Sequence, residues 1–117
     1  MFEISNEYLQ RTLVDLLNTP SPTGDTDYAI GFLQGELDVL GVPCQRTAKG
    51  ALVAQLEGHE SNRPRALSAH IDTLGAMVAE IKPNGRIRIA AIGGVMWPTV
   101  ESEGVYIATR SGRRIRG

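Results

Sequence analysis

Apolar side chains in the first forty residues recur at the spacing of two amphipathic helices. In the first helix, leucines follow one another at intervals of one, three and four residues, namely Leu9, Leu13, Leu16 and Leu17. Ser5 is placed to cap this helix. The helix should end before Pro20, because a residue that precedes proline avoids helical geometry.

A second helix is predicted after residues 20–24. Asp25 or Thr26 can cap it, and Gly41 is suited to stop it after Leu40. The two prolines and the glycine of residues 20–24 predict a rigid loop with a structural rather than a catalytic role. The buried face of the second helix should consist of five apolar residues, Ala29, Phe32, Leu33, Leu37 and Leu40.

From residue 43 the pattern changes to short strands. Residues 43–46 and 51–57 flank Lys49-Gly50, which indicates a hairpin. Residues 58–64 form a polar loop in which His59 should be exposed to solvent. Residues 65–69 are more apolar and predict a buried strand that leads directly to His70.

After Gly75 the chain consists of short strands joined by tight turns. Asn84-Gly85 is a frequent hairpin turn, and Ser111-Gly112 occupies a similar position in a second pair. Apolar and polar side chains alternate after Asn84-Gly85, so one face of that strand should be buried. The spacing predicts a small barrel, built from residues 76–81, 86–92, 105–109 and 113–115.

Composition is that of a globular protein, with 42% hydrophobic and 21% charged residues and a net charge of −1. Charge is uneven, with a balance of −6 over residues 1–60 and +5 over residues 61–117. Four arginines supply much of the basic half, but no aromatic side chains interleave with them as a nucleic-acid groove would require. We therefore expect solvated positions and salt bridges, and no nucleic-acid partner, at Arg110, Arg113, Arg114 and Arg116.

Cys44 is the only cysteine, so an internal disulfide is excluded and a reducing compartment is expected. It lies at a predicted strand start and should pack as a small hydrophobe rather than act as a nucleophile. Residues 1–5 lack the basic region and apolar stretch of a signal peptide, and no apolar run has the length of a membrane span. These features predict a cytoplasmic protein without membrane association.

The pattern with most chemical content is His70-Ile71-Asp72. Side chains two residues apart on a strand point to the same side, so His70 and Asp72 should project together from a carboxyl edge, where α/β sheets commonly bind ligands. An imidazole beside a carboxylate suits a zinc ligand with an orienting partner, or an acid/base pair. The alternative is an edge histidine that simply hydrogen-bonds its neighbour.

Residues 67–75, followed by Ala76-Met77-Val78 and Ile92-Gly93-Gly94, resemble the tetrahedral aminopeptidase family of dizinc metallopeptidases. This family includes glutamyl and deblocking aminopeptidases, some of them labelled endoglucanase. Further similar segments occur in the same order, at residues 20–24, 101–104 and 109–112.

The resemblance implies an α/β fold with two parts. Residues 1–75 would form the start of a dizinc-exopeptidase catalytic domain, and residues 76–117 the start of an inserted small β-barrel domain. The inserted domain implies homo-oligomeric assembly. Members of the family are much longer, so we expect this chain to be the N-terminal part of an aminopeptidase or a truncated reading frame, and to be inactive alone.

The resemblance also implies two divalent metal ions, most commonly zinc with cobalt or manganese as alternatives. A water activated by both ions would hydrolyse N-terminal residues from peptide substrates. By match to the family motif, His70 is a zinc ligand and Asp72 the active-site carboxylate that orients a ligand imidazole. The family's bridging aspartate, adjacent Glu-Glu pair and final histidine have no match here; Glu101 and Glu103 are not adjacent and should lie in a turn.

Two alternatives stay open at the level of sequence. A related dizinc deacylase or carboxypeptidase also has a His-x-Asp strand, although the passage of residues 74–78 directly into hairpins favours an aminopeptidase. The chain could instead be a noncatalytic β-rich module that binds or assembles through residues 76–117.

Overall fold

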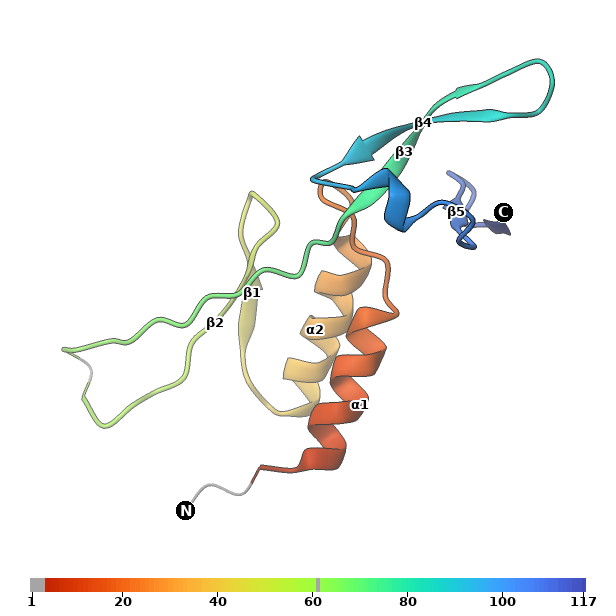
Figure 1. The fold of residues 1–117 in the computed structure, drawn as a ribbon. Helices are drawn as coiled ribbons and strands as arrows, with labels where there is room; N and C mark the ends of the chain where they lie inside the picture. The colour runs from red at the N-terminus through yellow and green to blue at the C-terminus, as the bar shows by residue number, and fades with distance from the viewer. Residues whose placement is uncertain (1–3, 61) are drawn as a thin grey trace.

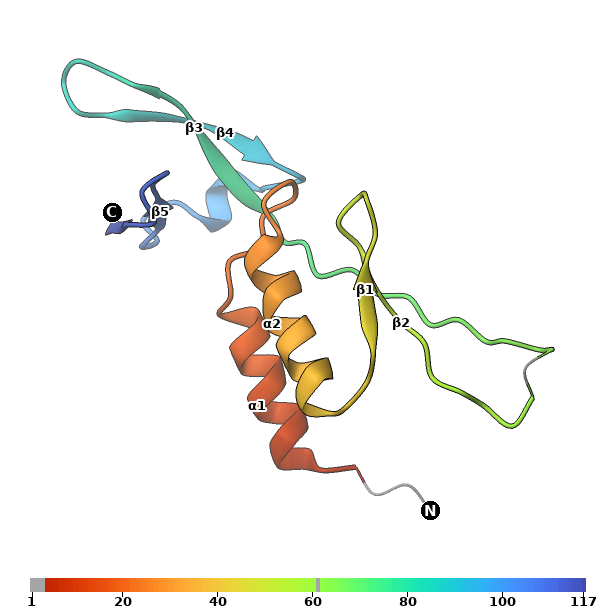
Figure 2. The same cartoon turned by 180° about the vertical axis from the view of Figure 1, so that it is seen from behind.

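The computed structural model of the chain describes residues 4–60 and 62–117. Two helices lie side by side, one hairpin lies beside the second helix, and another hairpin projects beyond the helices (Figure 1 and Figure 2). The described elements are α1 (Asn6–Leu17), α2 (Asp27–Val39), β1 (Cys44–Arg46), β2 (Leu52–Ala54), β3 (Gly75–Ile81), β4 (Ile87–Ile92), the 3₁₀ helix η1 (Trp97–Thr99), β5 (Tyr106–Ala108) and β6 (Arg114–Arg116).

The ends of both helices follow the local chemistry of the sequence. The Ser5 hydroxyl accepts a hydrogen bond from the Tyr8 amide at 3.2 Å, which confirms the predicted cap of α1. The helix ends at Leu17, before Pro20 as predicted. Thr26 occupies the N-cap position of α2 without a side-chain capping bond, and Gly41 follows the helix in a left-handed conformation with φ of +69°.

The packed core of the described residues is small. Ala29 and Ile30 of α2 are buried, and Ile30 was not among the residues predicted for the core. Leu40, which was predicted to be buried, is 57% exposed, while the other three predicted core residues of α2 are half-buried. The prediction was wrong at Leu40 because α2 packs mainly on α1 and β1, which leave its C-terminal end uncovered.

Within the described residues, three antiparallel hairpins form at the predicted turns, each as a separate two-stranded sheet. The pairs are β1–β2, β3–β4 and β5–β6, with the longest register running from Gly75 opposite Ile92 to Ile81 opposite Ile87. Gly85 adopts φ of +79° in the Asn84-Gly85 turn, a backbone conformation that favours glycine. The described residues of this half contain no closed barrel, so the barrel stays a prediction.

Two expectations about the strands were wrong. Residues 65–69 form no strand, and Leu67 is fully exposed. A strand needs a neighbour that takes its backbone hydrogen bonds, and no described strand pairs with these residues. The predicted buried face of β4 is also open to solvent, with Ile89 46% exposed, because no described element covers it closely.

The described elements leave much more surface open than a compact protein does. The accessible surface is 10689 Å², whereas a compact protein of this mass exposes about 6,200 Å². The radius of gyration is 18.4 Å, against about 13 Å for a compact domain of this length. Large apolar side chains such as Val39, Leu56 and Ile81 are exposed, so several helix and sheet faces have no partner among the described residues.

The loop between the helices is held against the segment that enters β3. Pro22 and Thr73 form an isolated parallel bridge. The Thr73 amide donates to the Ser21 carbonyl at 2.7 Å, and the Thr23 amide donates to the Thr73 carbonyl at 3.3 Å. Gly75 permits this approach, because a Cβ atom added there would lie 2.9 Å from the Pro22 Cβ. The predicted rigid loop therefore anchors the helical half to the start of β3.

The Gly75→Ala substitution should loosen this anchor. The added methyl group would overlap Pro22, and overpacking of this kind costs about 1–3 kcal/mol. We expect the Thr73 amide to exchange its hydrogen about tenfold faster or more, since about 1.4 kcal/mol corresponds to a factor of ten. Hydrogen exchange followed by mass spectrometry measures this change. Gly94→Ala is the matched control, because an added Cβ at Gly94 meets nothing within 4 Å; equal exchange in both variants would contradict the proposed clash.

The isolated 117-residue chain should associate in solution. Contiguous apolar patches and unpaired strand edges favour contacts between molecules, and the exposed faces described above provide both. Light scattering should therefore give an average mass well above the 12.6 kDa of one chain. A stable, well-folded monomer at micromolar concentration would contradict this expectation.

Candidate metal centre

His70 and Asp72 form a direct hydrogen-bonded pair in the loop that enters β3. The His70 Nδ1 atom lies 3.1 Å from the Asp72 Oδ1 atom and 3.1 Å from the Asp72 backbone oxygen. The sequence correctly predicted that these two side chains meet. The predicted secondary structure before His70 was wrong, because the segment that leads to His70 is irregular and not a strand.

The pair fixes which nitrogen of the imidazole carries the hydrogen. A backbone carbonyl and an ionised carboxylate can only accept hydrogen bonds, so the Nδ1 atom of His70 must be the donor. The Nε2 atom then keeps its lone pair. The His70 side chain is 84% exposed, which leaves the imidazole accessible as a ligand.

Thr23 contacts the same carboxylate from the loop between the helices. Its hydroxyl donates to the Asp72 Oδ2 atom at 2.6 Å. This hydrogen bond, followed by the one from His70, holds the pKa of Asp72 below its usual value, although partial desolvation acts in the opposite direction. Asp72 is therefore ionised at neutral pH and available as a double acceptor. Sequence reasoning missed Thr23, because its distance along the chain from Asp72 offers no local signal.

The described residues offer an accessible imidazole but no complete set of metal ligands. His70 supplies an accessible imidazole, and Asp72 supplies the carboxylate that orients it, which is the donor chemistry that zinc favours. No group of three or more His, Cys, Asp or Glu side chains in residues 4–60 and 62–117 is arranged to hold a metal ion. Glu101 and Glu103 lie in the turn that follows η1, as predicted.

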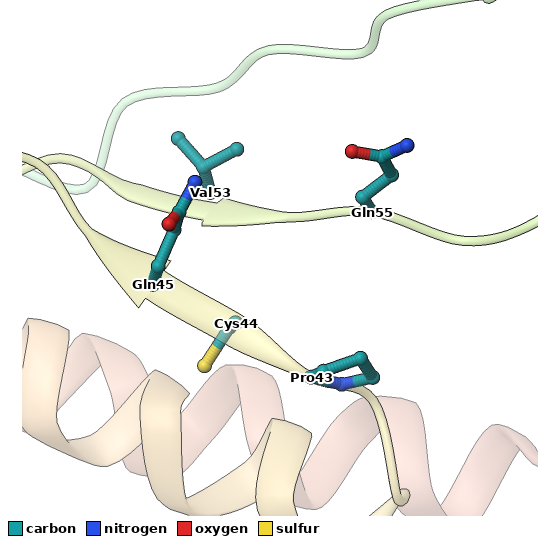
Figure 3. A pocket seen from close by; sticks show the side chains of 5 residues that line it. All are labelled: Pro43, Cys44, Gln45, Val53 and Gln55. Atoms are coloured by element: carbon teal, nitrogen blue, oxygen red, sulfur yellow. The ribbon is translucent and has the colours of Figure 1, made fainter.

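Two shallow hollows lie away from this pair. One, of about 280 Å³, is lined by Pro43, Cys44, Gln45, Val53 and Gln55 (Figure 3). Figure 3 shows the Cys44 sulfur directed toward the helices, on the opposite side of the strand from the Gln45 amide. Since no acid or base lines this hollow, it offers no support for a nucleophilic cysteine.

The second hollow, of about 480 Å³, is mainly apolar and lies between the η1 region and β4. Neither hollow includes His70 or Asp72, whose side chains are 84% and 39% exposed. The lining residues of this second hollow are Ile89, Trp97, Pro98, Val100, Glu101 and Val105.

The longest described helix, α2, has 13 residues. Among the residues that the structure describes, no helix combines the length and the apolar character needed to span a bilayer.

Comparison with known proteins connects the His70–Asp72 pair to a peptidase family. The profile of the M42 glutamyl aminopeptidase family matches residues 50–117. A putative aminopeptidase, YhfE, of Bacillus subtilis (strain 168) is 44% identical over 103 residues, which cover 88% of this chain and 30% of that protein. A glutamyl aminopeptidase of Lactococcus lactis subsp. cremoris (strain MG1363) is 28% identical over 85 residues, covering 72% of this chain and 24% of that protein.

The chain thus spans less than a third of the length of these curated relatives. The family profile nevertheless covers more than half of the chain, and the matched range contains His70, Asp72 and every described strand except β1. This family match agrees with the resemblance seen in residues 67–78. The chain therefore belongs to the M42 glutamyl aminopeptidase family.

Proposed function

We propose that the chain is the N-terminal part of a metal-dependent aminopeptidase that removes N-terminal residues from peptides. The observation that carries the proposal is His70, whose Nδ1 hydrogen is held by Asp72 and whose imidazole is accessible, within a segment that matches an aminopeptidase family. The names of two relatives, a putative aminopeptidase and a glutamyl aminopeptidase, support the same reaction class.

In this proposal, His70 holds one of two divalent metal ions through its Nε2 atom. Zinc is the preferred ion, with cobalt or manganese as alternatives. When bound, the metal ions supply an activated water and polarise the scissile carbonyl. Asp72 keeps the imidazole in the required tautomer and orientation. The described residues provide too few ligands for a two-metal centre, so we propose that the 117-residue chain alone has neither peptidase activity nor a tight zinc site.

Partners and location are part of the same proposal. The substrates are peptides, and residues 76–117 mediate homo-oligomeric assembly, which the exposed apolar side chains of this half support. We propose no nucleic-acid or membrane partner. A cytoplasmic location is consistent with a single free cysteine, Cys44, which suits a reducing compartment.

A noncatalytic assembly module is the second candidate function. The exposed apolar side chains around β3, β4 and η1, which include Met77, Ile89 and Trp97, favour it. The family match favours an aminopeptidase over related dizinc deacylases and carboxypeptidases. Activity and metal content of the full-length protein separate these functions.

In the full-length protein, His70→Ala should abolish most hydrolysis of an aminoacyl anilide and lower the bound zinc by about one ion. The physical reason is the loss of a nitrogen ligand that no described neighbour replaces. Elemental analysis and a turnover assay measure the two effects. The control is His59→Ala, because His59 is the other histidine of the chain and lies exposed in the loop before residue 65. Activity of His70→Ala near that of the control would refute the metal role.

Asp72→Asn should reduce turnover by about 10- to 100-fold while retaining more zinc than His70→Ala does. The amide keeps the size of the side chain but removes the negative charge that favours the His70 Nδ1 hydrogen bond. The same assays apply, with Asp38→Asn on the exposed face of α2 as the control for loss of one acidic group. An unchanged turnover number in Asp72→Asn would contradict the orienting role of Asp72.

A further inference from the structure

The two carboxylate oxygens of Asp72 have different partners, one local in the chain and one distant. The Oδ1 atom lies 3.1 Å from the His70 Nδ1 atom, and the Oδ2 atom accepts the Thr23 hydroxyl hydrogen at 2.6 Å. The terminal torsion of a carboxylate side chain has broad minima, so a single partner leaves its plane loosely defined. With a partner on each oxygen, both the position and the plane of the Asp72 carboxylate are held.

The backbone around Thr23 is itself held in place by hydrogen bonds and packing. Backbone hydrogen bonds join the Thr73 amide to the Ser21 carbonyl and the Thr23 amide to the Thr73 carbonyl, at 2.7 and 3.3 Å. Ser21 is only 2% exposed, and Pro22 packs where a Cβ atom of residue 75 would otherwise lie. The hydroxyl of Thr23 therefore approaches Asp72 from a fixed backbone rather than from a free loop.

Because the His70–Asp72 pair is exposed, the fixed backbone of Thr23 is important for the geometry of the pair. The Asp72 side chain is 39% exposed and the His70 side chain 84%, so water competes for both groups. A single hydrogen bond between exposed side chains therefore defines geometry weakly. A second hydrogen bond from a rigid donor reduces the freedom that remains to the carboxylate.

We propose that Thr23 is a positioning residue of the metal centre, which acts through Asp72 and does not touch the metal. Its hydroxyl fixes the Asp72 carboxylate, the carboxylate keeps the hydrogen on the His70 Nδ1 atom, and the Nε2 atom is thereby presented as the ligand. This inference rests on the proposed function, because it requires His70 to be a metal ligand.

The test compares three variants of the full-length protein. Thr23→Val keeps the shape of the side chain and removes the hydroxyl, whereas Thr23→Ser keeps the hydroxyl. Thr19→Val is the matched control, because the Thr19 hydroxyl donates to the Asp15 backbone oxygen at 2.8 Å at the end of α1. The measurements are zinc affinity, by competition with a chelator, and kcat and KM for an aminoacyl anilide.

We expect Thr23→Val to weaken zinc binding and lower kcat by about tenfold each, at the low end of the usual loss for groups that orient a ligand histidine. KM should be nearly unchanged, because the proposed role of Thr23 is exerted through Asp72 on the metal ligand. Thr23→Ser and Thr19→Val should leave zinc affinity and kcat close to those of the unmodified protein. If Thr23→Val does not fold, Thr23→Ala is measured in its place, with the same expected loss.

Three outcomes overturn the inference. They are unchanged zinc affinity and kcat in the variant without the hydroxyl, an equal loss in Thr23→Ser, and an equal loss in Thr19→Val. The proposed function fails separately, if His70→Ala retains zinc and activity. Inactive His70→Ala together with unchanged Thr23→Val leaves the proposed function in place and removes only the role of Thr23.

Discussion

The bridge between the loop that precedes α2 and the segment that enters β3 is the constraint on which the rest of the described structure depends. Its two backbone hydrogen bonds join Ser21 and Thr23 to Thr73. Gly75, which begins β3, packs against Pro22 in the same contact. The bridge therefore places the β3–β4 hairpin relative to the helices, and it also brings the Thr23 hydroxyl to Asp72.

The geometry of the His70–Asp72 pair matters for chemistry more than for stability. Both side chains retain contact with water, and a hydrogen bond that is open to water contributes only modestly to the free energy of unfolding. Their hydrogen bonds instead decide which imidazole nitrogen is free to bind a metal ion. Because the accepting groups are a carboxylate and a backbone carbonyl, the free nitrogen is Nε2.

Elements that depend on a few neighbouring residues were predictable from the sequence. Ser5 caps α1, Gly41 follows α2, and Asn84-Gly85 turns the β3–β4 hairpin, in each case because the interaction lies within a few residues of backbone. Burial was less predictable. Leu40 and the apolar face of β4 carry the periodicity of core positions, but periodicity names a face and does not supply the element that covers it.

The sequence by itself determined the helices, the hairpin turns, the pairing of His70 with Asp72 and the family to which the chain belongs. The His70–Asp72 pair was accessible to sequence reasoning because its members are two residues apart and meet locally. Only the tertiary structure decided that residues 65–69 lack a pairing strand, since strand pairing is a contact between distant segments. It alone brought Thr23 to Asp72, 49 residues away, because that contact arises from the packing of Pro22 on Gly75 and has no counterpart in local sequence.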